Sequence, residues 1–263
     1  MSTVETHFGS TISGRSEIRR IGEADLNWAL LQGWKDFKEK RGDVIILALI
    51  YPVVGLLSAA MAFNVRLLPM FFPLVAGLSI LGPAVASGFY ELARRHEAHL
   101  PSGWVHFLDP FGGRNRTGLL VMTAALVVVF LLWLTAAWMI YAATLADFQP
   151  ATLREFAVRL FGTPEGWSLI SIGMLVGFAF AAITLVLTLV SFPMLVDKAT
   201  DPLTAVSTSI RAVSENPGAA ASWGLRVAGL LVLGCLPLFI GLAVVLPVLG
   251  YASWHLYTRL VVR

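Results

Sequence analysis

The sequence predicts an all-α protein, a polytopic transmembrane helical bundle of about six spans with amphipathic interfacial helices on its cytoplasmic side. Composition is the first observation: 57% of the 263 residues are apolar and only 13% are charged, whereas a soluble domain carries about 25% charged residues. Length is the second, because several apolar runs reach the roughly 20 residues that a spanning helix needs. The distribution of basic residues is the third, since it gives the bundle an orientation.

The apolar runs divide the chain into three parts. We expect residues 1–22 to form a disordered N-terminal tail and residues 23–43 to form an amphipathic helix on the cytoplasmic surface. Residues 44–263 then form a membrane domain. Its predicted spans cover residues 44–63, 67–90, 117–141, 167–192, 219–239 and 241–260.

The last apolar run, from about residue 219 to residue 262, is too long for one span. Pro237 and Gly241 interrupt it near its middle, where a helical hairpin can reverse direction. We therefore predict the fifth and sixth spans here. The alternative is a protein of five spans, with one long bent helix in place of the hairpin.

Lysine and arginine residues are distributed unevenly between the two sides of the predicted bundle. Of the 19, all but Arg66, Arg154 and Arg159 fall on the side that carries both ends of the chain. Loops rich in Lys and Arg stay in the cytoplasm. Both termini are therefore predicted to be cytoplasmic, and the even number of spans agrees with this orientation.

The segment before the first span carries an apolar face. Leu26, Leu30, Trp34 and Phe37 recur at helical spacing, while polar residues such as Asp36 are assigned to the opposite face. A helix with this pattern is predicted to lie on the inner surface of the membrane.

A second amphipathic helix is predicted after the fourth span. Asp201 is a favourable N-cap residue, and Pro202 suits the first helical position. An apolar face then extends from Leu203 to Val213, and Asn216 with its following proline ends the helix.

Catalytic, metal and cofactor chemistry has little support in the sequence. No ionisable side chain lies deep in a predicted span, where it would indicate ion-coupled transport. His96, Glu97 and His99 do not complete a metal-ligand set. We therefore predict no enzymatic activity, no metal and no cofactor. A competing hypothesis, an interfacial enzyme that uses Glu91, Glu97, His96 or His255, lacks a recognisable nucleophile–base pair.

Charged and polar residues gather at the cytoplasmic ends of the predicted spans. Spacings of three and four allow Glu91 to pair with Arg95, and Arg94 to pair with Glu97. We predict that this cytoplasmic rim joins the helix ends and serves as a docking surface. Its candidate residues are Tyr90, Glu91, Arg94, Arg95, Glu97, Asp197, Arg211, Asn216, Trp254 and His255.

Glycines within the spans are candidates for close helix packing, because a residue without a side chain lets two helices approach. The candidates are Gly77, Gly82 and Gly88 in the second span, and Gly173 and Gly177 in the fourth. The last two also form a Gly-x-x-x-Gly pattern that can dock a partner helix.

Four segments of the chain carry a family resemblance: Gly88–Glu97, Ser191–Asp197, Ala205–Pro217 and Tyr251–Tyr257. They resemble a family of bacterial integral membrane proteins known as domain of unknown function 2189. Ala93 and His96 depart from the family pattern, which has serine and arginine there. The resemblance implies a six-span protein of proteobacterial inner membranes, and it implies no activity.

Two functions remain in competition after these observations. The first is a non-enzymatic accessory, assembly or structural partner of a larger membrane complex, for example a respiratory or photosynthetic one. The second is a transporter or channel for a neutral or lipid-like molecule, suggested by the prolines that interrupt the predicted spans. The expected partners are the lipid bilayer and a membrane protein or a second copy of the chain. Nucleic acid is not expected, because membrane topology explains the basic residues.

Overall fold

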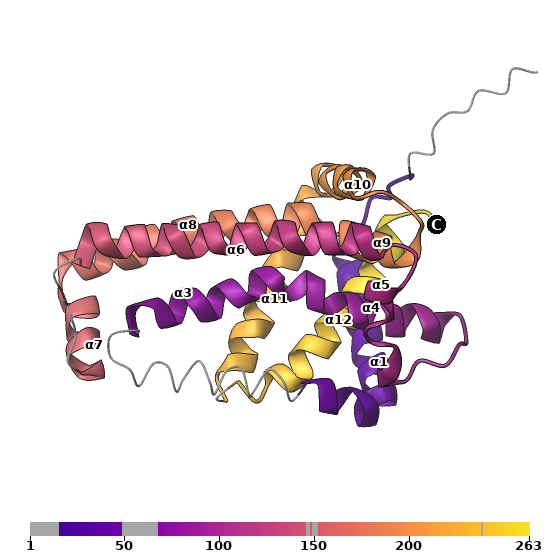
Figure 1. The fold of residues 1–263 in the computed structure, drawn as a ribbon, viewed down its shortest axis with the longest axis horizontal. Coiled ribbons are helices and arrows are strands. Elements are labelled where there is room, and N and C mark those ends of the chain that lie inside the picture. The colour runs from indigo at the N-terminus through magenta and orange to yellow at the C-terminus, as the bar shows by residue number, and fades with distance from the viewer. Residues whose placement is uncertain (1–15, 49–67, 146–147, 149–151, 238) are drawn as a thin grey trace, which may run out of the picture.

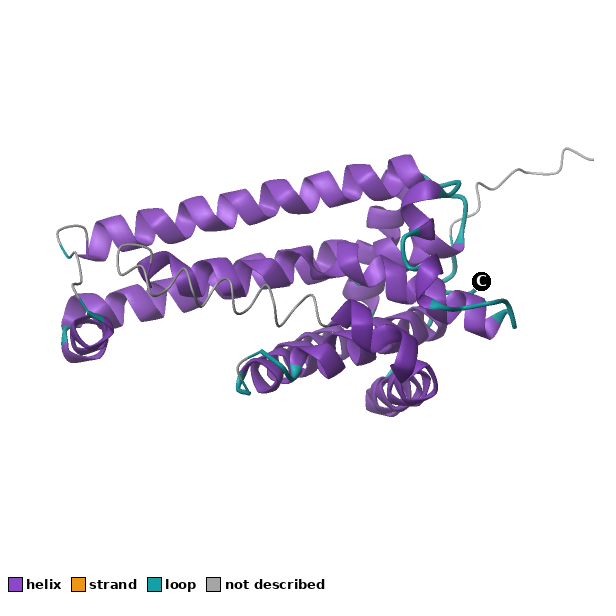
Figure 2. Ribbon diagram, turned by 60° about the horizontal axis from the view of Figure 1, so that its bottom comes forward, coloured by secondary structure: helices purple, strands orange, loops and turns teal. Residues whose placement is uncertain are grey.

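The computed structural model describes residues 16–48, 68–145, 148, 152–237 and 239–263. Figure 2 shows helices joined by short loops in this part of the chain, which contains no strand. The α-helices are α1 (Glu23–Ala48), α3 (Leu68–Leu78), α4 (Gly82–Glu97), α5 (Asp109–Gly112), α6 (Arg116–Leu145), α7 (Leu153–Gly162), α8 (Pro164–Thr188), α9 (Ser191–Asp197), α10 (Pro202–Glu215), α11 (Pro217–Cys235) and α12 (Leu242–Leu260). Two 3₁₀ helices, η2 (Ser79–Leu81) and η3 (Trp104–His106), complete the set.

Helices α6 and α8 and the successive helices α3 and α4 run along the long axis of the molecule. In Figure 1, α6 and α8 lie side by side, with α3 and α4 arranged end to end beneath them. Helix α7 lies at one end of this layer, and α9, α10 and the end of α12 lie at the other. We call the second end the charged end, because Glu91, Arg94, Arg95 and Asp197 lie there.

Four helical stretches within the described residues are long and apolar enough to cross a membrane. They are Met70–Glu97, Arg116–Leu145, Pro164–Asp197 and Pro217–Cys235. These correspond to the predicted second, third, fourth and fifth spans. The class of fold, an all-helical membrane protein, therefore agrees with the sequence.

Outward-facing side chains on α6 and α8 explain why this layer belongs in lipid. Buried residues such as Leu126 and Trp133 hold α6 against its neighbours. The opposite faces of both helices expose large apolar side chains: Leu120, Val128, Leu131 and Met139 on α6, and Met174, Leu175 and Phe178 on α8. So much exposed apolar surface is unfavourable in water and matches a hydrocarbon solvent.

The predicted first and sixth spans are not among the four apolar stretches, for two different reasons. The first falls mostly in residues 49–67, outside the described part of the chain. The sixth coincides with α12, which is 19 residues long but is not among the four apolar stretches. His255, Thr258 and Arg259 make its second half polar, and the buried Trp254 and Tyr257 hold that half inside the protein. Pro237 and Gly241 lie in the turn between α11 and α12, where the chain was predicted to break.

The predicted second span is a broken helix. A 3₁₀ turn at Ser79–Leu81 separates α3 from α4, and proline occupies position 73 within α3 and position 83 at the start of α4. Proline removes a backbone hydrogen bond and leaves carbonyl groups that need other donors. The Nε1 group of Trp133 donates to the Pro73 carbonyl at 2.7 Å, and the Ser79 hydroxyl donates to Ala76 O at 2.6 Å. Side chains of α6 and η2 therefore bond to two carbonyl groups of α3 close to the break.

Helix α1 packs against α12, and this contact corrects the predicted apolar face. Leu26 and Phe37 are buried as expected, but Trp34 is 43% exposed. The buried face includes Gly33 instead, and it includes Asp36, which the sequence had placed on the polar side. Small residues allow a closer approach than a tryptophan does, so the side of the helix that carries Gly33 faces α12.

Candidate functional site

The Glu91 carboxylate is the centre of the first cluster at the charged end. Its side chain is only 6% exposed and accepts hydrogen bonds from two arginines. Arg94 binds it through two nitrogens, at 2.8 and 2.7 Å, and Arg95 Nε donates at 2.8 Å. The predicted Glu91–Arg95 pair is therefore present, whereas Arg94 pairs with Glu91 and not with Glu97. A charge removed from water needs such partners, because an unpaired buried carboxylate is strongly unfavourable.

Arg95 extends this cluster to the loop that follows α4. Its NH2 group lies 2.7 Å from Asp109 Oδ2, and its NH1 group donates to Pro101 O at 3.1 Å. Asp109 also meets His106 Nδ1 at 2.8 Å. The arginine thus fixes the position of the whole loop from Pro101 to Asp109. Neither His106 nor Asp109 was among the predicted rim residues. Asp109 joins the two, because it pairs with His106 three residues away and with Arg95 14 residues away.

A second cluster joins α4, α9 and α12 around Arg263. Its guanidinium lies 2.7 Å from Glu97 and 3.5 Å from Asp197, and it stacks over Trp254 at 4.8 Å. The Trp254 Nε1 group donates to Glu97 at 3.2 Å, and the Tyr257 hydroxyl donates to Asp197 at 2.9 Å. The predicted residues Glu97, Asp197 and Trp254 therefore meet in one network. Arg263 and Tyr257 complete it and were not predicted.

His255, the remaining predicted residue on α12, pairs with α1. Its Nε2 atom lies 2.7 Å from Asp36 Oδ2, and both side chains are largely buried. The ring also meets Trp28 edge to face, with centroids 5.6 Å apart. Asp36 was missed as a site residue. Its spacing of three from Gly33 and seven from Ala29 places all three on one face and was the available signal.

Asn216 contacts a distant segment of the chain, whereas Arg211 pairs within its own helix. Asn216 is buried and accepts from Ile21 N at 2.9 Å, while its amide donates to Arg19 O at 3.2 Å. It therefore holds the segment before α1 against the end of α10. Arg211 lies 3.7 Å from Glu215 on its own helix and is not part of either cluster described above. Tyr90 is buried in the helical core.

The structure separates the predicted packing glycines into two groups. A Cβ atom added to Gly77 would lie 2.6 Å from Trp133, one added to Gly88 would lie 2.5 Å from Phe107, and one added to Gly177 would lie 3.2 Å from Trp133. These three positions are close approaches. A Cβ atom at Gly82 or Gly173 would meet nothing within 4 Å. The Gly-x-x-x-Gly pattern of α8 thus packs at one of its two ends.

Helix α10 begins as its sequence predicts. Asp201 caps it by accepting from Thr204 N at 2.9 Å. The hydrogen bonds from Thr204 lower the pKa of the Asp201 carboxyl. Ser209 then fixes the helix, because its hydroxyl accepts from Val190 N at 3.1 Å and donates to Val186 O at 2.8 Å. The cap and Ser209 together hold α10 at the charged end.

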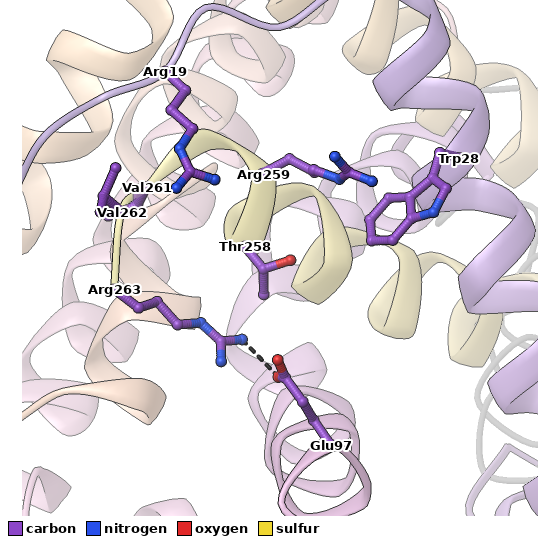
Figure 3. Close-up of a pocket in the computed structure, with 8 residues that line it drawn as sticks. All are labelled: Arg19, Trp28, Glu97, Thr258, Arg259, Val261, Val262 and Arg263. Carbon is purple, nitrogen blue, oxygen red and sulfur yellow. Dashed lines mark hydrogen bonds and ion pairs between the residues drawn. The ribbon is translucent and has the colours of Figure 1, made fainter.

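A shallow hollow of about 430 Å³ opens at the charged end. Figure 3 shows Arg19, Arg259 and Arg263 around it, with Trp28 at the upper right and Glu97 below. A dashed line in the figure marks the ion pair between Arg263 and Glu97. The side chains that line the hollow carry more positive than negative charge, so it favours an anion.

These observations define a class: a helical integral membrane protein whose helix ends are joined at one end by ion pairs. Residues 71–197 match the model of a family described as a predicted integral membrane protein, DUF2189. No curated protein and no solved structure matches the chain. The matched range includes the Glu91 cluster and Asp197. The resembling segments Ala205–Pro217 and Tyr251–Tyr257 lie beyond it.

Proposed function

We propose that this protein is a non-enzymatic accessory or assembly component of a larger complex in the bacterial inner membrane, such as a respiratory or photosynthetic one. In this proposal both termini are cytoplasmic, and the charged end faces the cytoplasm. The partner is a membrane protein that docks on this end.

One observation carries the proposal: a rigidly held apolar loop at the charged end. Val105 and Leu108 are 60% and 69% exposed, and Trp104 beside them is also exposed. Their loop is not loosely attached, because Arg95 binds both Pro101 O and Asp109 while it also binds the buried Glu91. A fixed and exposed apolar surface favours association, since little conformational entropy is lost when a partner covers it.

Helix α10 supplies a second exposed surface at the same end. Its small or polar residues, including Ala205 and Ala212, are buried against the bundle. Leu203, in contrast, is 82% exposed, and Ile210 is also exposed. Leu203 and Ile210 therefore lie on the outside of the helix, whereas Val206 and Val213 pack partly against the core. This orientation suits a docking surface that lies beside the helix ends.

The ionisable groups of the charged end support a structural role over a catalytic one. Glu91 binds two arginines, and Glu97 binds Arg263 and Trp254. The oxygens of both carboxylates are thus occupied by partners within the protein, which leaves little of either group to contact a substrate. The transport alternative is weakened by the Trp133 bond to Pro73 O, because a protein donor and not a water-filled cavity meets the backbone of the second span there.

The test is purification of the tagged full-length protein from native membranes in a mild detergent, followed by native gel electrophoresis and mass spectrometry. We expect one stoichiometric complex. The double variant Val105→Ser/Leu108→Ser should lose it. The matched control is Leu153→Ser/Phe161→Ser on α7, where the side chains are 67% and 60% exposed at the opposite end.

Two results would contradict the proposal. If the wild-type protein migrates alone or as a homodimer, the accessory role is wrong and transport becomes the better hypothesis. If the complex survives in the loop variant as well as in the control, the partner docks elsewhere.

A further inference from the structure

We infer that the hollow at the charged end binds a phosphate group, and that this group belongs to an anionic phospholipid headgroup. The inference depends on the membrane fold and not on the accessory role proposed above.

Backbone pairing between distant segments builds the hollow. Ile18 forms an antiparallel bridge with Val261. Arg19 N donates to Leu260 O at 2.8 Å, and Val262 N donates to Glu17 O at 3.0 Å. The segment before α1 is thereby fixed against the end of α12. The Arg19 and Arg259 side chains both line the hollow, as Figure 3 shows.

The arginines of the hollow differ in how fully they are used. Arg263 is engaged by Glu97 at 2.7 Å. The ion pair of Arg259 with Asp25 is long, at 4.0 Å. Within the described part of the chain, the Arg19 guanidinium has neither an ion pair nor a hydrogen bond. Two guanidinium groups at one hollow are therefore available to an anion.

Trp28 orients one of these two groups. The Arg259 guanidinium lies over the Trp28 ring at 4.0 Å, which holds its plane by a cation–π contact and leaves its N–H edge for other partners. The Thr258 hydroxyl is already used, because it donates to His255 O at 2.8 Å. The free donors at the hollow are thus guanidinium N–H groups, which fit phosphate oxygens in a two-pronged geometry.

The position of the hollow favours a lipid as the source of the phosphate. It lies at the end of helices whose sides expose apolar residues to hydrocarbon, and it includes a tryptophan. Tryptophan is enriched at headgroup level, and basic pockets there bind anionic headgroups. A phospholipid already present in the bilayer would reach this site without entering from water.

Binding is tested on the full-length protein in a neutral detergent by native mass spectrometry and by thermal shift. The probes are phosphatidylglycerol, phosphatidylcholine and inorganic phosphate. We expect phosphatidylglycerol to bind and to raise the melting temperature, and phosphatidylcholine to bind far more weakly. Arg19→Gln and Arg259→Gln should each weaken phosphatidylglycerol binding about tenfold, because each removes a charge-assisted pair.

The matched control is Arg20→Gln, which removes the same charge one residue away from a side chain that does not line the hollow. It should bind as the wild type does. Arg19→Lys adds a second criterion, since it keeps the charge but loses the two-pronged geometry and should bind with intermediate affinity. The Arg19 guanidinium has no ion pair or hydrogen bond in the described chain, and the backbone bonds of Arg19 do not depend on its side chain, so its variants should melt like the wild type without lipid.

The inference is overturned if Arg19→Gln and Arg20→Gln bind phosphatidylglycerol equally, because general surface charge would then explain binding. It is also overturned if all three probes leave the melting temperature unchanged. If inorganic phosphate binds with the same arginine dependence and phosphatidylglycerol does not, the site recognises phosphate and the lipid assignment is wrong.

Discussion

Replacing Gly33 with alanine tests how closely α1 packs on α12. A Cβ atom at this position would lie 2.6 Å from Ala252 N and from Val248 O, and 2.8 Å from Ala252 Cβ. Ordinary contacts of a Cβ atom begin near 3.4 Å. The obstructing atoms include the backbone of α12, which cannot rotate away as a flexible side chain can. The two helices must therefore separate by nearly 1 Å, roughly the difference between these distances, and the contacts of the buried Leu26 and Phe37 weaken.

The magnitude follows from two opposing effects. Alanine is the better helix former by about 1 kcal/mol, which favours the variant. Overpacking against unyielding atoms costs about 1–3 kcal/mol, and the backbone clash places Gly33 near the upper limit. The net destabilisation is about 1–2 kcal/mol. For a protein of this size it corresponds to a fall in melting temperature of about 2–8 °C.

The assay is the thermal unfolding of the full-length protein in detergent, followed by tryptophan fluorescence. The control is Gly173→Ala in α8, where the added Cβ atom meets nothing within 4 Å. That variant should melt at the wild-type temperature or slightly above it. If Gly33→Ala melts as high as the control does, the close contact of α1 with α12 is wrong.

Three further changes have defined outcomes. Glu91→Gln leaves two arginines without their shared charge partner and should destabilise the protein by about 2–3 kcal/mol. This loss is smaller than for a fully buried pair, because the arginines are partly exposed. An unchanged melting temperature would contradict this prediction. Trp133→Phe removes the donor to Pro73 O and should lower stability by about 1 kcal/mol, with α3 showing the fastest hydrogen exchange. The hydrogen bonds from Thr204 lower the pKa of the Asp201 carboxyl. The ionised carboxyl therefore stabilises the start of α10 fully at a pH above the ordinary pKa of aspartate. This stabilisation is lost as the pH falls through the lowered pKa. Hydrogen exchange in α10, corrected for its intrinsic pH dependence, should show this loss, and Asp201→Asn should remove the pH dependence.

Local patterns in the sequence were sufficient for much of the fold. Apolar runs located α6 and α8, because a spanning helix needs only its own length and composition. The cap at Asp201 and the pair of Glu91 with Arg95 were also predictable, since their partners lie three and four residues away. The break between α11 and α12 followed from Pro237 and Gly241.

Contacts between distant residues were beyond these patterns. Asp36 and His255 are separated by 219 positions, and Glu97 and Arg263 by 166, so no helical periodicity relates them. The face of α1 was misjudged for a related reason. Periodicity gives weight to large side chains such as Trp34, whereas the observed contact depends on a glycine that adds no hydrophobicity.

The packing of α1 on α12 has a consequence for synthesis of the protein. Roughly 200 residues separate these two helices in the chain, and translation at about 5–20 residues per second needs on the order of 10–40 s to produce them. During that interval α1 has no α12 to cover Ala29, Gly33 and Asp36. The nascent chain must therefore shield this face against the membrane surface or a chaperone, and the N-terminal helix reaches its final position only after the last helix has left the ribosome.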